Sequence, residues 1–145
     1  IMSLKDGSKK MSKSELSDLS RINLTDDKDQ IVNKIKKAKT DTLPLPFKDD
    51  DLENRPEVKN LFGIYSSLIS SDLKKTIKDF SGKNFSDFKE VLTEVLVEKI
   101  VPISTEIKKL LNDKSYLDKI LSDGSKKADE IASKKVKKIH EIIGF

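Results

Sequence analysis

The fold is decided by residues 85–112, which read FSDFKEVLTEVLVEKIVPISTEIKKLLN. Apolar side chains recur every three or four residues here, the spacing that places them on one face of an α-helix. Pro102 lies inside the pattern. Because proline lacks a backbone N–H and crowds the preceding turn, we expect it to kink or split this helix. The apolar positions are Phe88, Val91, Leu92, Val95, Leu96, Ile100, Ile103, Ile107, Leu110 and Leu111.

Helical spacing also dominates the rest of the chain beyond residue 24, and no segment shows sustained strand alternation. Short connections between such segments predict an all-α fold, a helical bundle of five to six helices preceded by a flexible loop. We expect helices to begin after Thr25, at Pro56, after Ser71-Asp72, near Tyr116 and at Ser125, and to end before Pro44, Gly82, Gly124 and Gly144. The last helix is expected to face inward through Ala128, Ile131, Ala132, Val136, Ile139 and Ile143.

Composition narrows the class of protein. The chain has 145 residues, 37% of them charged, with a net charge of +4, so it predicts one small domain with a mixed charged surface. It has no cysteine and a single histidine, His140, which excludes thiolate metal sites and makes a histidine-based triad improbable. No apolar run reaches the roughly 20 residues of a membrane span, and residues 1–10 show no signal-peptide core. We therefore expect no metal site, no membrane and a cytoplasmic location; the start at Ile1 suggests a fragment.

One motif carries chemistry. Lys10-Met11-Ser12-Lys13-Ser14 lies in a polar, serine-rich stretch, residues 1–21, that we expect to be a mobile loop with a short strand at Ile1 to Leu4 and a turn at Asp6-Gly7. Lys10 and Lys13, three residues apart, suit the closing of a loop over a triphosphate, because an ammonium donates three hydrogen bonds to phosphate oxygens. Charge placed on a leaving pyrophosphate stabilises the transition state, so both lysines are candidate catalytic residues.

The whole chain resembles the carboxy-terminal part of a class I aminoacyl-tRNA synthetase of the bacterial tryptophanyl type. The resemblance implies a signature-loop segment at the edge of the Rossmann catalytic domain, residues 1–24, and an α-helical anticodon-side domain, residues 25–145. Its carriers are Ile1-Met2-Ser3-Leu4, Lys9-Lys10-Met11-Ser12-Lys13-Ser14, Ile22-Asn23-Leu24-Thr25-Asp26-Asp27, Lys34-Ile35-Lys36-Lys37-Ala38, Thr40-Asp41, Asn54-Arg55-Pro56-Glu57-Val58-Lys59-Asn60-Leu61, Phe88-Lys89-Glu90 and Gly124-Ser125-Lys126-Lys127-Ala128.

This resemblance implies activation of L-tryptophan by ATP with Mg²⁺ and transfer of the aminoacyl group to tRNA(Trp), by an enzyme that is a homodimer in the family. It implies ATP contacts from Ile1, Lys10, Met11, Ser12, Lys13 and Ser14. The family's tryptophan pocket and most of its catalytic domain precede this segment, so we expect the 145 residues alone to be inactive. Glu15-Leu16 stands where an Asp-Pro pair is common, which affects the stiffness of the loop rather than its chemistry.

The sequence leaves two interpretations open for the lysines of the last helix and alternatives open for the chain as a whole. Lysines of the last helix, among them Lys134, Lys137 and Lys138, either track a tRNA backbone or form an ordinary solvated face. His140 is interpreted as structural, and Phe62, Tyr65, Phe80, Phe85 and Phe88 as core. For the chain as a whole, a tyrosyl-type synthetase and a non-enzymatic helical RNA-binding or adaptor module remain alternatives.

Overall fold

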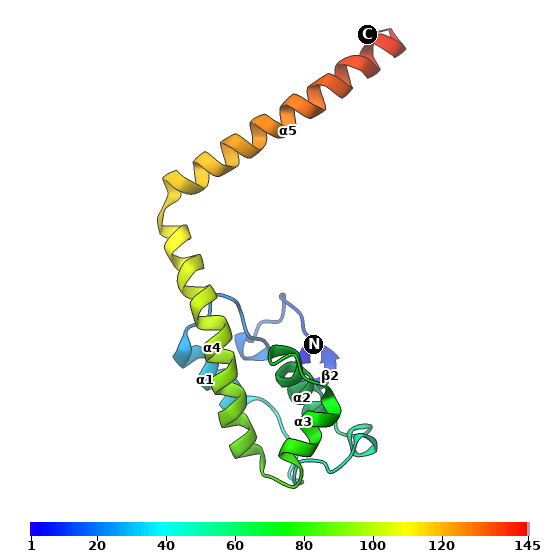
Figure 1. The fold of residues 1–145 in the computed structure, drawn as a ribbon, viewed down its shortest axis with the longest axis vertical. Helices are drawn as coiled ribbons and strands as arrows, with labels where there is room; N and C mark the ends of the chain where they lie inside the picture. The colour runs from blue at the N-terminus through cyan, green and yellow to red at the C-terminus, as the bar shows by residue number, and fades with distance from the viewer. Residues whose placement is uncertain (145) are drawn as a thin grey trace. The chain divides into compact units, whose positions relative to one another are not determined.

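The computed structural model describes residues 1–144 (Figure 1). A two-stranded antiparallel hairpin, β1 (Met2–Ser3) and β2 (Asp6–Lys10), precedes the helices. The helices are α1 (Lys28–Lys37), α2 (Pro56–Leu68), α3 (Leu73–Phe80), α4 (Phe85–Asn112) and α5 (Lys114–Ile143), with short 3-10 turns η1 (Asp18–Ser20) and η2 (Asp49–Leu52). The predicted all-α class is confirmed, since the hairpin is the one small sheet within the described residues.

The chain divides into two compact units, Ile1–Thr105 and Glu106–Phe145. The core lies in the first. Its centre is a set of edge-on aromatic rings, with Phe88 4.8 Å from both Phe62 and Phe80, as measured between ring centroids. Tyr65 packs edge-on against Phe80 and Phe88. The prediction that these aromatic residues form core is confirmed. The buried apolar residues around them are Leu4, Ile31, Ile35, Ala38, Leu45, Leu52, Val58, Leu61, Ile77, Leu92 and Leu96.

The local start and stop signals are mostly confirmed. Pro56 is the first residue of α2, and Asp72 caps α3 by accepting a hydrogen bond from the Lys74 amide. Gly82 and Gly144 take positive φ values of 70° and 82° just beyond helix ends, a conformation that glycine adopts without a steric penalty.

Thr25 as an N-cap is wrong. Asp27 caps α1 instead, in a reciprocal capping box in which its carboxylate accepts from the Gln30 amide and the Gln30 side chain accepts from the Asp27 amide. Asp26, which directly follows Thr25, precedes the cap and is buried, where it pairs with Lys34 of the helix.

The expectation that residues 1–21 form one mobile loop is wrong for its first half. The predicted strand at Ile1 to Leu4 is confirmed as β1, but Asp6-Gly7 begins β2 and the turn lies two residues earlier, at Leu4-Lys5. Leu4 is buried in the core, and the Lys39 amide donates to its carbonyl oxygen at 2.8 Å. A non-local contact, invisible to local sequence patterns, therefore orders this segment. Residues 11–17 have no regular structure, as expected of a loop.

Two helix breaks expected in the carboxy-terminal half are absent from the described residues. α4 continues through Pro102, and α5 continues through Gly124. A proline removes a single intrahelical hydrogen bond, and a glycine costs a helix only about 1 kcal/mol relative to alanine, so a long helix accommodates each.

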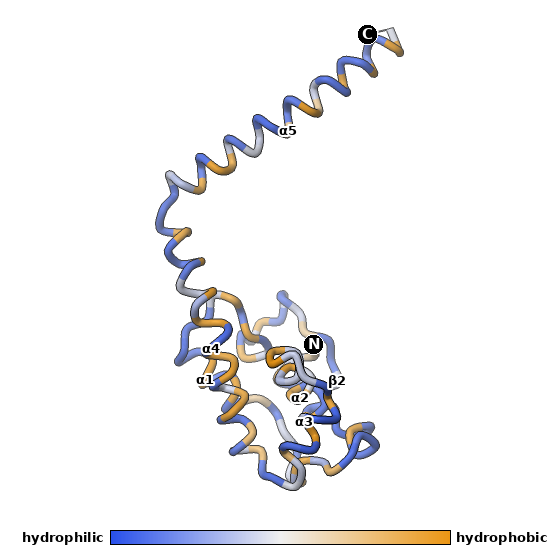
Figure 2. Tube along the Cα trace, in the orientation of Figure 1, coloured by the Kyte–Doolittle hydropathy of each residue, from blue (hydrophilic) through white to orange (hydrophobic). Residues whose placement is uncertain are grey.

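The inward face predicted for the last helix is also wrong. None of the residues of α5 is buried, and its isoleucines stand at the surface, Ile131 being 69% exposed. Figure 2 shows apolar and polar positions alternating along α5, in keeping with an amphipathic helix.

Candidate functional site

The signature residues begin at the last residue of β2 and continue into the loop. Lys10 ends the strand, and Met11, Ser12, Lys13 and Ser14 follow it. Met11 is half-buried and the other four are exposed. The Ser12 and Ser14 hydroxyls share a hydrogen bond of 2.9 Å, which folds the tip of the loop. Within residues 1–144 neither Lys10 nor Lys13 has a hydrogen bond or an ion pair from its ammonium group, so both are available to an anion.

Two cavities flank the hairpin. A cavity of about 270 Å³ brings Lys10 and Ser12 together, and it is lined by Ser3, Lys5, Asp6, Lys9, Lys10, Ser12, Glu15 and Ser20. Ile1, expected to contact the same nucleotide, lines a different cavity of about 500 Å³, with Met2, Gly7, Glu53, Pro56, Lys59, Asn60, Gly63, Ile64 and Ser67. The structure therefore places Lys10 and Ser12 at one cavity and Ile1 at another.

The hairpin is held against α2. The Asn60 side chain accepts from the Met2 amide at 2.9 Å and donates to the Met2 carbonyl oxygen at 3.1 Å, so one side-chain amide satisfies both backbone groups of Met2. On β2, the backbone of Pro56 and Glu57 lies so close to Gly7 that a Cβ atom there would stand 2.5 Å from it. Glycine is required at this position because the α2 backbone lies too close for a side chain, and not because the chain turns there.

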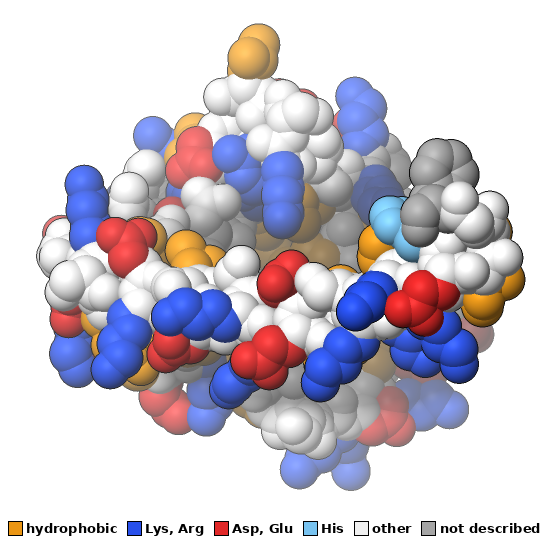
Figure 3. Space-filling view, turned by 90° about the horizontal axis from the view of Figure 1, so that it is seen from above, with side chains coloured by type: hydrophobic (Ala, Val, Ile, Leu, Met, Phe, Trp, Pro, Cys, Tyr) orange, Lys and Arg blue, Asp and Glu red, His pale blue; other side chains and the backbone are white. Residues whose placement is uncertain are grey.

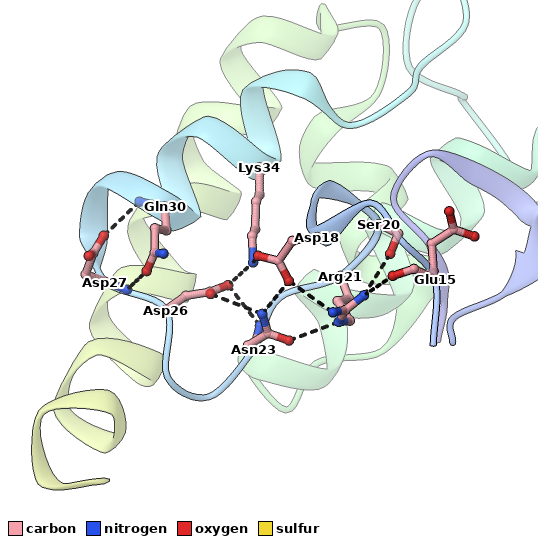
Figure 4. A network of polar contacts seen from close by, with 9 residues as sticks. All are labelled: Glu15, Asp18, Ser20, Arg21, Asn23, Asp26, Asp27, Gln30 and Lys34. Atoms are coloured by element: carbon pink, nitrogen blue, oxygen red, sulfur yellow. Dashed lines mark hydrogen bonds and ion pairs between the residues drawn. The ribbon is translucent and has the colours of Figure 1, made fainter. Parts of the chain in front are cut away.

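The far end of the loop is held by a buried ion-pair network (Figure 4). Lys34 of α1, only 3% exposed, donates from Nζ to Asp18 and to Asp26, at 2.6 Å each. Hydrogen bonds from Lys34 and Asn23 lower the pKa of Asp18, so its carboxylate is ionised near neutral pH. Arg21 closes the network by pairing with Asp18 at 3.2 Å.

The sequence that forms these features matches a known family. The model of the family described as "tRNA synthetases class I (W and Y)" matches residues 1–102. The chain belongs to this family. Its predicted resemblance to class I synthetases is thereby confirmed, on a match that covers the hairpin, the signature residues and helices α1 to α3.

Individual relatives of this synthetase chain are named tryptophan–tRNA ligase. The tryptophan–tRNA ligases of Mesorhizobium japonicum and Rickettsia felis are 50% and 51% identical to it over all 145 residues. The chain spans 41% and 43%, respectively, of the length of these relatives. The crystal structure of tryptophanyl-tRNA synthetase from Mycoplasma pneumoniae matches with a TM-score of 0.61 and 31% identity, over 75% of this chain and 35% of that one.

The lysines predicted to meet tRNA, Lys134, Lys137 and Lys138, all lie on α5 and are exposed. Over the face of this synthetase chain shown in Figure 3, basic side chains are interspersed with acidic ones rather than gathered into one patch. A role in tRNA binding therefore stays a prediction. His140 is in the last turn of α5, where a cation suits the negative end of the helix.

Residues 1–144 contain no group of three or more histidine, cysteine, aspartate or glutamate side chains placed to hold a metal ion. No helix among them is both long enough and apolar enough to cross a membrane.

The anchoring residues were missed by sequence reasoning. Lys34 had a visible signal, because it stands three residues after Ile31 and one before Ile35, inside the apolar stripe of α1, where a charge needs a buried partner. Asn60 and Gly7 offered no such signal, since their partners lie about 50 to 60 residues away in the chain.

Proposed function

We propose that this chain is the carboxy-terminal part of a tryptophan–tRNA ligase, in which it supplies the loop that closes on ATP and the helical tRNA-side domain. The observation that carries the proposal is a pair of ammonium groups without a partner in residues 1–144, on Lys10 at the end of β2 and on Lys13 in the loop that follows, within a class I synthetase chain. Relatives named tryptophan–tRNA ligase, about half identical over the full 145 residues, support tryptophan as the amino acid.

In this proposal Lys10 and Lys13 donate hydrogen bonds to the phosphate oxygens of MgATP while the carboxylate of tryptophan attacks the α-phosphorus. As the bond to pyrophosphate breaks, negative charge grows on the departing oxygens, and two fixed ammonium groups stabilise that charge more than they stabilise bound ATP. Ser12 and Ser14 offer hydroxyl and amide donors to the same phosphates. Met11 lies toward the adenine, and Ile1 contacts ATP through its backbone.

Magnesium enters with the nucleotide, as part of the MgATP substrate, and the aminoacyl group then passes to tRNA(Trp). Contacts from Lys134, Lys137 and Lys138 to the tRNA backbone would add affinity that falls as salt is raised. The proposal includes the homodimer of the family, a cytoplasmic location, and no ligase activity from the 145 residues alone.

The experiment is Lys13→Ala in the complete ligase, read by ATP–pyrophosphate exchange. We expect kcat to fall by roughly 100- to 1000-fold with a much smaller change in the KM for ATP, as for the loss of one transition-state charge donor. Lys9→Ala is the control, because Lys9 is an exposed lysine of β2, just before the loop, whose ammonium group already pairs with Asp6 at 3.3 Å. Equal losses of kcat and ATP affinity would contradict the transition-state role, and preferential charging of tRNA(Tyr) would contradict the choice of amino acid.

A further inference from the structure

The buried lysine of α1 is poorly explained as part of the core alone. Lys34 projects from the same helix face as Ile31 and Ile35, both fully buried, and a leucine or methionine would fill that position without desolvating a charge. Instead its Nζ atom meets two carboxylates. Asp26 is buried beside it, but Asp18 lies on η1, about half-exposed, at the point where the signature loop rejoins the folded unit. The lysine thus reaches out of the core toward the loop.

From Asp18 the contacts continue toward the signature itself. Asp18 Oδ1 accepts from Asn23 Nδ2 at 2.8 Å and pairs with Arg21 Nη2 at 3.2 Å. Arg21 Nη1 then donates to the backbone carbonyl oxygen of Glu15 at 3.2 Å, and Glu15 directly follows Ser14, the last residue of the signature. Figure 4 shows these side chains converging from α1 and from the segment that follows the loop.

The network defines the length of loop that is free to move. On the near side, β2 is fixed to α2 at Gly7, and on the far side the Leu4 amide donates to the Ser20 carbonyl oxygen at 2.8 Å. While the Lys34–Asp18–Arg21 contacts hold, Arg21 fixes the backbone at Glu15, and only residues 11–14 have neither regular structure nor an anchoring contact. If they are lost, this stretch extends to about residue 19, and the lysine ammonium groups gain a wider range of positions.

We propose that Lys34, Asp18 and Arg21 are positioning residues of the signature loop, fixing its carboxy-terminal end so that Lys10 and Lys13 reach the nucleotide phosphates in one orientation. This inference rests on the proposed function, since it gives those lysines their task. Their effect is on the rate of adenylate formation, because a displacement of a catalytic group by about 1 Å can reduce a rate roughly 100-fold.

Asp18 is the residue to change. Removing Lys34 would leave the buried carboxylate of Asp26 without its cation and would risk unfolding, whereas Asp18 is half-exposed and its loss leaves the Lys34–Asp26 pair in place. The variants are Asp18→Ala, Asp18→Glu, which keeps a carboxylate, and Asp29→Ala as control. Asp29 is an exposed residue of α1 whose carboxylate has no hydrogen bond or ion pair within residues 1–144.

In the complete ligase we expect Asp18→Ala to lower the kcat of ATP–pyrophosphate exchange roughly 10- to 100-fold, with the KM values for ATP and tryptophan within about twofold. Asp18→Glu should recover most of the rate, and Asp29→Ala should match the parent enzyme. An unchanged kcat, or a loss that appears only where the protein unfolds, overturns the proposal.

A second readout keeps this test separate from that of the proposed function. Nuclear relaxation of the backbone amides of residues 11–17, measured on the 145-residue chain without nucleotide, should show increased motion in Asp18→Ala and not in Asp29→Ala. Unchanged relaxation overturns the anchoring itself. If the motion increases but Lys13→Ala leaves exchange activity intact, the proposed function fails and the kinetic role of the anchor is overturned with it.

Discussion

Replacing Gly7 by alanine should release the hairpin from α2. The added Cβ atom would lie 2.5 Å from the carbonyl carbon and oxygen of Pro56 and from the amide nitrogen of Glu57. All three are backbone atoms at the first turn of a helix, so no side-chain rotation relieves the overlap, and β2 or α2 must shift. Overpacking of this kind costs about 1–3 kcal/mol. Any shift also strains the paired hydrogen bonds of Asn60 to Met2.

Urea unfolding followed by circular dichroism measures the effect. We expect Gly7→Ala to lower the free energy of unfolding by about 1–3 kcal/mol. The control is Gly63→Ala, also in contact with the cavity beside the hairpin, where an added Cβ atom meets nothing within 4 Å. Because Gly63 lies inside α2, alanine should stabilise the protein by roughly 0.5–1 kcal/mol. If Gly7→Ala proves as stable as the parent chain, the close approach between β2 and α2 does not exist as described.

Three further variants, two at ion pairs and one on α5, have expected effects on the free energy of unfolding. Lys34→Met should lower the free energy of unfolding by about 3–5 kcal/mol in chemical denaturation, because it removes the cation that pairs with the buried carboxylate of Asp26 and leaves only hydrogen bonds from Asn23; a neutral result would mean that Asp26 is hydrated or protonated. Arg55→Lys should cost about 1–3 kcal/mol, since Arg55 donates two hydrogen bonds to Asp41 at 2.9 and 2.7 Å. Burial raises the pKa of Asp41, but its hydrogen bonds outweigh burial and hold that pKa below the ordinary 3.8. The Arg55 contribution is therefore fully present above pH 3.8 and is lost as pH falls through the folded pKa, so a parent–variant difference that stayed constant down to pH 2 would argue against the pair. Ile131→Ser, on the exposed stripe of α5, should leave the unfolding free energy of the first unit within about 0.5 kcal/mol of the parent value; a larger drop in thermal or urea unfolding would show that α5 stabilises that unit.

The features that the sequence predicts correctly are those with local causes. Pro56 begins α2 because its missing amide would be unpaired at that position in any case, and Asp72 caps α3 with its own side chain. The aromatic core follows from helical spacing alone. The signature lysines were identified by type and spacing, and the structure confirms that they lie in a loop and at its edge.

The errors share a different cause. Residues 1–10 contain few apolar side chains, and their order comes from Asn60, Lys39 and Ser20, which lie about 16 to 58 residues away along the chain. No local pattern encodes such pairs. The errors in α5 have the opposite origin: its apolar stripe has the spacing of a buried helix, but spacing alone does not identify what, if anything, packs against it.

The anchors also limit how far the loop can reach. Eight peptide steps separate Lys10 from Asp18, so a fully extended loop spans at most about 28 Å, and its midpoint stands at most about 14 Å from its base. Lys13 lies three peptide steps from Lys10, so its Cα atom stays within about 11 Å of the Cα atom of Lys10. At the far end, the loop is held by the Leu4–Ser20 hydrogen bond and by the ion pair of Asp18 with Lys34. Both contacts tie the loop to the core built by α1 and α2, and Leu4 itself is part of that core. Under the proposed function, a nucleotide must therefore be presented close to the hairpin, and the loop would close by rearranging residues 11–14 rather than by swinging the hairpin away from the helices.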